Sequence, residues 1–166
     1  MLKHEIAHTK GVWHIDYKYP IYVATDGSKA GIGGYIYQIV EGEERVVSYY
    51  SRKTTSEEKK WDTRQIELLA LISTIENFHV LVDGHVFTVK SDHANLKWLL
   101  KQKNLSGRLG RWVLRLSEYR MRFEFQKGET MHVADCASRN PIDIGVVQLG
   151  DGHYELALSD HLTTDE

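Results

Sequence analysis

The chain has 166 residues, 42% of them hydrophobic and 27% charged, which is typical of a folded domain with a full core. No apolar stretch approaches the roughly 18 residues that a membrane span needs, and the first residues lack the apolar core of a signal peptide. The single cysteine, Cys136, excludes an internal disulfide framework and suits a reducing compartment, so we expect an intracellular protein.

The net charge of −2 is unevenly distributed along the chain. Six acidic side chains and no Lys or Arg follow Arg139, so residues 1–142 carry 21 basic and 17 acidic side chains. Between His93 and Ser117 there are six basic residues and no acidic one. Such a local positive field attracts a polyanion, although a solvated helix face is the simpler explanation on charge alone.

The first half of the chain is patterned for strands. After the break at Tyr19-Pro20, β-branched and aromatic residues predict three strands, over 21–25, 35–40 and 45–51. Small residues over 26–34 predict the first turn, and residues 41–44 predict a hairpin connection. Because the connections are short, we expect an antiparallel meander.

Helical periodicity begins after residue 54. A capping box over 55–58 and a second cap from Asp62 with Gln65 precede apolar positions on one helical face, which predict a largely buried helix over 66–82. The pattern then predicts a strand, two helices, a half-exposed strand and a short last helix, over 85–91, 96–100, 109–116, 121–126 and 132–138. The order βββ-α-β-αα-β-α predicts an α/β fold with a five-stranded mixed sheet flanked by helices.

Four acidic residues occupy positions that this fold brings together: Asp26, Glu67, Asp92 and Asp135. Asp26 and Asp92 end the first and fourth strands, so they lie side by side at one sheet edge if those strands are neighbours. Taken singly, each acid has an ordinary explanation as a turn, an exposed helix position or a helix cap. Taken together, converging carboxylates repel one another unless cations hold them, which predicts divalent metal ions and favours two-metal hydrolysis of a phosphodiester.

Five segments carry a family resemblance: YVATDGSKAGIGGYIYQ, VVSYYSRKTTSEEKKWDTRQIELLAL, FTVKSDHANLKWLL, GRLGRWVLRLSEYRMRFEFQKG and VADCASRNP. In this order and spacing they resemble the ribonuclease H domain of gypsy-class LTR retrotransposon reverse transcriptases. The likeness covers residues 19–141. It implies an N-terminal connection segment (1–18), a ribonuclease H domain (19–141) and an acidic C-terminal linker (142–166).

The resemblance implies a ribonuclease H-like fold that hydrolyses the RNA strand of RNA–DNA hybrids with two Mg²⁺ ions, for which Mn²⁺ can substitute. It makes Asp26, Glu67, Asp92 and Asp135 the catalytic, metal-binding carboxylates, with Glu67 also near the ribose 2′-hydroxyl. The implied partners are an RNA–DNA hybrid and the covalently linked polymerase, connection and other domains of a Pol polyprotein. The implied location is the cytoplasm, in virus-like particles.

The candidate substrate-binding residues are His93, Arg108, Arg111, Arg115 and His132. The three arginines project on adjacent helical turns, which suits contacts to the phosphates of the DNA strand. His93 belongs to the Asp-His pair of the family, and roles in orienting the site, in substrate contact or in structure stay open. His132 replaces the usual Asn, and an exposed loop histidine is its simplest interpretation. Phe125 stands where many relatives carry a mobile-loop histidine.

Two functions from other classes stay open. A non-catalytic ribonuclease H-like module, which binds hybrid or only supports the polymerase, would be marked by a lost carboxylate, and none of the four is lost. An integrase or transposase of the same superfamily would end its acidic triad in Glu, whereas the last acid here is Asp135. Zinc is not expected, because there is one cysteine and the histidines lack ligand spacing.

Overall fold

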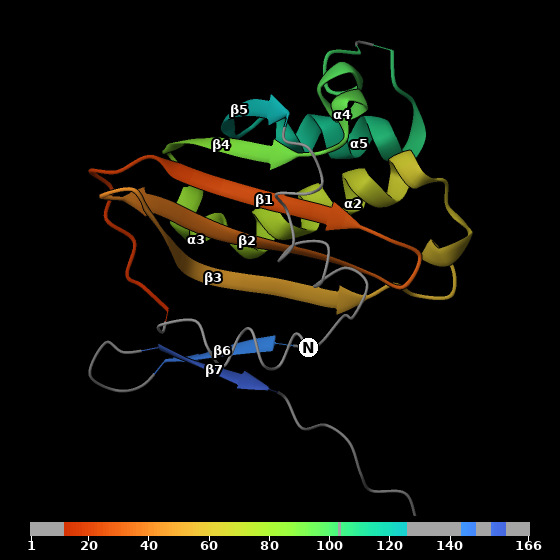
Figure 1. Cartoon of the computed structure of the whole chain (residues 1–166). Helices are drawn as coiled ribbons and strands as arrows, with labels where there is room; N and C mark the ends of the chain where they lie inside the picture. Colours follow the sequence, from red (N-terminus) through yellow and green to blue (C-terminus); the bar gives the residue numbers. More distant parts are fainter. Residues whose placement is uncertain (1–11, 103, 126–143, 149–153, 159–166) are drawn as a thin grey trace, which may run out of the picture.

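A five-stranded mixed sheet forms the centre of the protein, whose computed structural model describes residues 12–102, 104–125, 144–148 and 154–158 (Figure 1). The strands are β1 (Ile21–Gly27), β2 (Gly31–Val40), β3 (Glu43–Lys53), β4 (Val86–Ser91) and β5 (Arg120–Phe125). Their spatial order is β3-β2-β1-β4-β5. The first three are antiparallel neighbours, while β4 runs parallel to β1 and β5 parallel to β4. The predicted mixed sheet and its antiparallel meander are confirmed.

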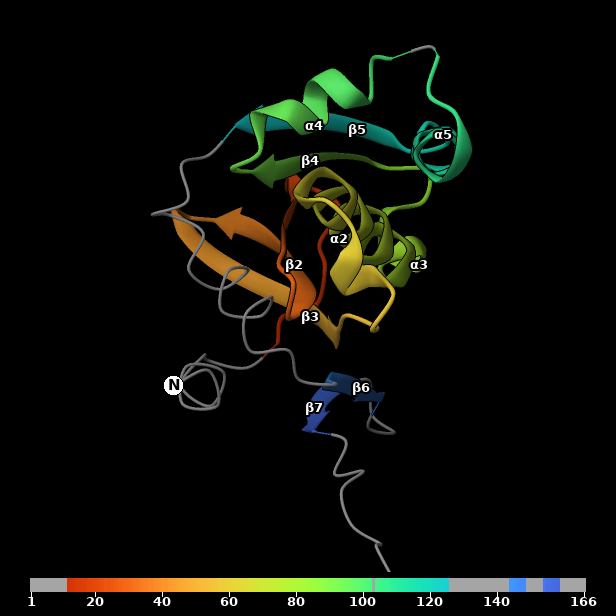
Figure 2. The ribbon, with the colours of Figure 1, turned by 90° about the vertical axis from the view of Figure 1, so that its right-hand side faces the viewer.

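The helices are the 3₁₀ helix η1 (Glu58–Lys60) and the α-helices α2 (Thr63–Asn77), α3 (His79–Val82), α4 (Ala94–Leu99) and α5 (Gly107–Leu116). Figure 2 shows α2 and α3 against one face of the sheet. The single helix predicted over 66–82 is wrong at one point, because α2 and α3 are separated at Phe78. The backbone of Phe78 leaves the helical region, with φ −95° and ψ 13°, and its side chain is buried in the core.

Helix α2 begins with a capping box that satisfies two backbone N–H groups. The backbone N–H of Gln65 donates to Asp62 Oδ1 at 2.9 Å, and the N–H of Asp62 donates to Gln65 Oε1 at 3.3 Å. This start was predicted from the sequence and is confirmed. Buried positions lie on almost every side of the helix: Ile66, Glu67, Leu68, Leu69, Ala70, Leu71, Ile72, Thr74 and Ile75. A carboxylate on this helix is therefore carried into the interior.

The glycines after the first strand are strand residues, whereas the sequence predicted a turn over the whole of 26–34. Strand β2 already starts at Gly31. A Cβ atom at Gly34 would lie 2.6 Å from the Thr74 side chain and 2.7 Å from the carbonyl oxygen of Ala24. Only a residue without a side chain fits there, so the glycine allows α2 to approach the sheet closely.

A segment before β1 and a segment after β5 both border the outer strand β3. The backbone N–H of Trp13 donates to the carbonyl oxygen of Val46 at 2.9 Å, so residues before β1 pair with this edge. Strands β6 (Ile144–Gln148) and β7 (Tyr154–Leu158) form a separate antiparallel pair beside β3 (Figure 1). The last predicted helix, 132–138, lies outside the described residues. Among the helices described, none is long and apolar enough to cross a membrane.

Candidate active site

Asp26 and Asp92 lie at the same edge of the sheet because their strands are parallel neighbours. In the β1–β4 register, Ala24 pairs with Lys90. Asp26 and Asp92 each follow two residues later along the same direction. Both are partly buried. We expected these two acids to lie side by side if the first and fourth strands are neighbours, and the sheet order confirms that they are.

Glu67 approaches this edge from α2 and is only 1% exposed. Burial, together with the nearby charges of Asp26 and Asp92, raises the pKa of Glu67 to about 9, although a hydrogen bond from the backbone of Gly27 opposes the shift. A Cβ atom at Gly27 would lie 2.8 Å from the carbonyl oxygen of Ile66. The end of β1 is thus packed directly against the start of α2, which brings three acids from distant parts of the chain into electrostatic contact.

His93 connects two of these carboxylates. Its Nδ1 atom lies 2.8 Å from Asp92 Oδ1 and 3.3 Å from Glu67 Oε1. Its backbone N–H donates to the Ser91 hydroxyl at 3.1 Å, which fixes the turn after β4. Because both acceptors face the same ring nitrogen, a proton on Nδ1 links the end of β4 to the buried helix acid.

The oxygen donors of the site suit a hard divalent cation. Glu67 Oε2 is buried and has no hydrogen-bond partner among the residues described, so one carboxylate oxygen remains available in the interior. Within that same part of the chain, no group of three or more His, Cys, Asp or Glu side chains comes close enough to hold an ion. The fourth predicted carboxylate, Asp135, lies outside the described residues, and so does His132.

The three candidate arginines of α5 have different surroundings. The Arg108 guanidinium stacks 3.7 Å from the centroid of the Trp61 ring and also faces Trp112 at 5.9 Å. Arg115 forms an ion pair with Glu76 of α2. Arg111 is exposed. Of the three, Arg108 and Arg115 hold α5 against its neighbours, whereas Arg111 presents its charge to solvent.

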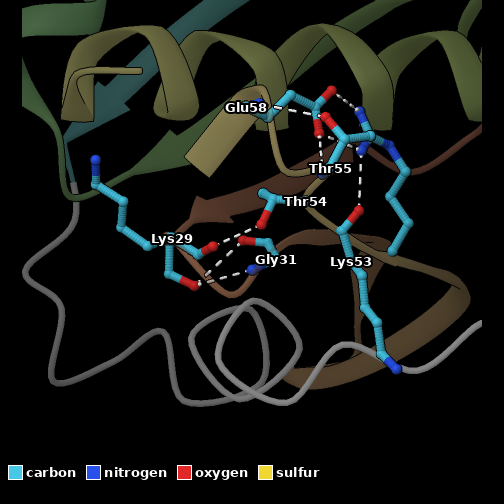
Figure 3. A network of polar contacts seen from close by, with 8 residues as sticks. Lys29, Gly31, Lys53, Thr54, Thr55 and Glu58 are labelled. Carbon is cyan, nitrogen blue, oxygen red and sulfur yellow. Dashed lines mark hydrogen bonds and ion pairs between the residues drawn. The ribbon is translucent and has the colours of Figure 1, made fainter. Parts of the chain in front are cut away.

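A polar network beside the site was missed by the sequence analysis (Figure 3). Arg52 and Glu58 form a two-pronged ion pair, with Nη1–Oε2 at 2.8 Å and Nη2–Oε1 at 2.9 Å. Lys29, in the turn after β1, donates to backbone carbonyls near η1. The capping box over 55–58 was the available signal, because Thr55 and Glu58 do cap one another. Nothing in the local pattern indicated that Arg52 and Lys29 join it.

The sheet order and the acids at the ends of β1 and β4 define the class of protein as an RNase H-like domain. Among solved structures, the chain is similar to RNase H1 from the halophilic archaeon Halobacterium salinarum, with TM-score 0.53 and 16% identity over 72% of this chain and 96% of that one. It is also similar to a foamy viral protease-reverse transcriptase in complex with RNA/DNA hybrid, with TM-score 0.60 and 17% identity over 91% of this chain and 23% of that one. At these identities the likeness establishes the fold alone.

The sequence also matches the family described as the RNase H-like domain found in reverse transcriptase, over residues 16–119. The chain belongs to this family. It is 35% identical over 138 residues to the retrovirus-related Pol polyprotein from transposon 412 of Drosophila melanogaster, covering 83% of this chain and 11% of the relative. It is 32% identical over 123 residues to the retrovirus-related Pol polyprotein from transposon opus of the same species, covering 74% of this chain and 12% of the relative. The chain thus spans about a tenth of these relatives.

Proposed function

We propose that this domain is a metal-dependent endonuclease that hydrolyses the RNA strand of RNA–DNA hybrids during reverse transcription of a gypsy-class retroelement. The observation that carries the proposal is the position of Glu67, an acid whose pKa is raised by its burial and by the nearby charges of Asp26 and Asp92. A fold does not keep a carboxyl group beside two others in its interior for stability, because both burial and like charge oppose ionisation. Such clusters mark functional sites.

Divalent cations are the natural counter-charge for this cluster. Asp26, Glu67 and Asp92, with Asp135, would hold two Mg²⁺ ions, for which Mn²⁺ can substitute. When bound, the ions would supply activation of the attacking water and stabilisation of the leaving oxygen. His93 would orient Asp92 and Glu67 through its Nδ1 atom, since ligand orientation commonly depends on such outer contacts. Arg111, exposed on α5, would contact a phosphate of the hybrid.

The similar proteins support the proposed partners of this domain. The curated proteins that the chain matches are Pol polyproteins, many times longer than the chain. These relatives support the proposal that the domain is part of a polyprotein, linked to a polymerase and its connection segment. Its location in virus-like particles in the cytoplasm is a further part of the proposal, which the family resemblance implies. The domain limits of 1–18, 19–141 and 142–166 remain a prediction.

The test is cleavage of an end-labelled RNA paired with DNA, with and without Mg²⁺, against matched duplex RNA and duplex DNA. Cutting of the hybrid RNA that requires Mg²⁺ is the expected result. A chain that binds the hybrid with Mg²⁺ and leaves it intact would instead be a non-catalytic hybrid-binding module. Cleavage of duplex DNA at a comparable rate would contradict the proposed substrate.

A further inference from the structure

The turn after Asp26 is fastened to the segment before Glu67 by one lysine side chain. Lys29 Nζ donates to the carbonyl oxygen of Lys59 at 2.8 Å and to that of Trp61 at 2.9 Å. Lys29 lies three residues after Asp26, and Trp61 six residues before Glu67. The lysine thus joins two chain segments that each carry a carboxylate of the site.

The turn is also held from its other side by the end of β3. The hydroxyl of Thr54 donates to the carbonyl oxygen of Lys29 at 2.5 Å (Figure 3). The N–H of Thr54 donates to the carbonyl oxygen of Ala30 at 3.3 Å. Thr54 is 5% exposed, so its hydroxyl is withdrawn from water and gains from this bond. The backbone of the turn is therefore held in place independently of the contacts that the Lys29 side chain makes.

The segment that receives the lysine is itself rigidly placed. Glu58 accepts both Nη groups of Arg52, at 2.8 and 2.9 Å, and also the backbone N–H of Thr55 at 2.8 Å. Charge-assisted, two-pronged pairs of this kind fix geometry as well as adding energy. Of the two carbonyls that Lys29 contacts, that of Lys59 lies within the anchored 3₁₀ helix and that of Trp61 directly follows it.

We infer that Lys29 is a positioning residue, which sets the distance between Asp26 and Glu67 by bracing the β1–β2 turn against the η1–α2 connection. This inference rests on the proposed function. The two segments already touch where Gly27 approaches the carbonyl of Ile66. One contact of that kind permits the strand end to pivot, whereas a second attachment at Lys29 prevents it. Lys29 is exposed and its ammonium group donates to two backbone carbonyls, so it acts on the metal ions by placing the chain segments that carry their ligands.

The test compares Lys29→Met with Lys29→Arg, and uses Lys59→Met as the matched control. Lys59, in η1, contributes a backbone carbonyl to the brace but its side chain is exposed, so its substitution removes a like charge from the other side of the brace and keeps that carbonyl. Mg²⁺ affinity is measured by isothermal titration calorimetry on the full chain, and hybrid cleavage gives kcat and KM. Thermal unfolding is followed in parallel.

For Lys29→Met we expect Mg²⁺ to bind about 10-fold more weakly, the lower end of what loss of a supporting contact costs a metal site. At a fixed Mg²⁺ concentration kcat falls by a similar factor and recovers as Mg²⁺ is raised, while KM for the hybrid stays within about two-fold. The melting temperature falls by no more than about 2–4 °C, because the lost bonds are exposed. Lys29→Arg, which keeps the donors, restores Mg²⁺ binding, and Lys59→Met resembles the wild type.

Unchanged Mg²⁺ affinity in Lys29→Met overturns the inference, and so does an equal loss in Lys59→Met. If Lys29→Met does not fold, Thr54→Val removes the hydroxyl that holds the Lys29 carbonyl and must weaken Mg²⁺ binding in the same direction. A wild-type chain that binds Mg²⁺ without cutting hybrid contradicts the proposed function yet still tests Lys29. If the wild type and Lys29→Met cut the hybrid equally well, the positioning role of Lys29 is ruled out while the proposed nuclease function stands.

Discussion

The guanidinium group of Arg108 stacks on the ring of Trp61, 3.7 Å from its centroid. Trp61 directly precedes Asp62, the residue that caps α2, and its ring also contacts Trp112 of α5, with centroids 5.7 Å apart. One arginine therefore ties α5 to the start of the helix that carries Glu67. The charge of Arg108 is thus engaged within the protein.

Replacing Arg108 should therefore affect stability. Arg108→Gln removes the cation–π contact, so we expect the free energy of unfolding to fall by about 0.5–1 kcal/mol. Urea denaturation measures the change. Arg108→Lys keeps the charge and loses the planar stack, so it should recover only part of the loss. Equal stability of the lysine variant and the wild type would show that charge alone matters at this position.

Arg111 should instead report on nucleic acid. Arg111→Gln removes an exposed charge, so we expect weaker binding of hybrids of any sequence. The plot of the logarithm of the binding constant against the logarithm of the salt concentration should become shallower by about one unit of slope. Stability should stay within about 0.5 kcal/mol of the wild type. Arg115→Gln is the control, because the Arg115 charge is already paired with Glu76. If Arg115→Gln flattens the salt dependence as much as Arg111→Gln does, the assignment of Arg111 as the phosphate contact is wrong.

Asp92→Asn separates chemistry from folding. Asparagine has nearly the same shape and its amide oxygen can still accept from His93, so the fold should be retained. The variant lacks the negative charge that a cation needs, and we expect hybrid cleavage to fall by at least about 100-fold. Hybrid binding and the melting temperature, measured on the same preparation, should change little. Cleavage at the wild-type rate would rule out Asp92 as a metal ligand.

The ion pair of Arg52 with Glu58 predicts a dependence of stability on pH. Hydrogen bonding to Arg52 lowers the pKa of Glu58. A lowered pKa in the folded state contributes stability above the unfolded pKa, which is lost as the pH falls through the folded pKa. Glu58→Gln should therefore be less stable than the wild type by about 1–2 kcal/mol at pH 7, and the difference should shrink under acid. Denaturant titrations at pH 7 and pH 3 compare the two proteins, and a constant difference would contradict this origin.

The features that the sequence predicted are those with a local signature. β-Branched and aromatic residues over 21–25 and 45–51 located two strands of the meander, and the Asp62–Gln65 pair marked the start of α2. The break at Phe78 left no such signature, because an apolar residue continues the helical pattern while its side chain turns into the core.

The candidate site likewise contains features that the sequence predicts and features that depend on tertiary packing alone. The adjacency of Asp26 and Asp92 followed from strand order, which the motif order already suggested. The depth of Glu67 could not be derived from its neighbours in the chain, since it depends on α2 packing closely against the sheet at Gly34. The contact of Lys29 with Lys59 spans 30 residues and that of Arg52 with Glu58 spans six. Both depend on tertiary structure, and no periodicity in the sequence predicts them.

The parallel pairing of β1 with β4 also has a meaning for folding. Paired residues in these strands, such as Ile21 and Phe87, are 66 positions apart in the chain (87 − 21), and the connection between the strands includes the buried helix. Long-range parallel pairing is entropically costly and requires the intervening chain to be ordered. Asp26 and Asp92 consequently come together only once the chain between these strands is ordered. Enzymatic competence of this domain would be an all-or-none property that appears only with the native topology.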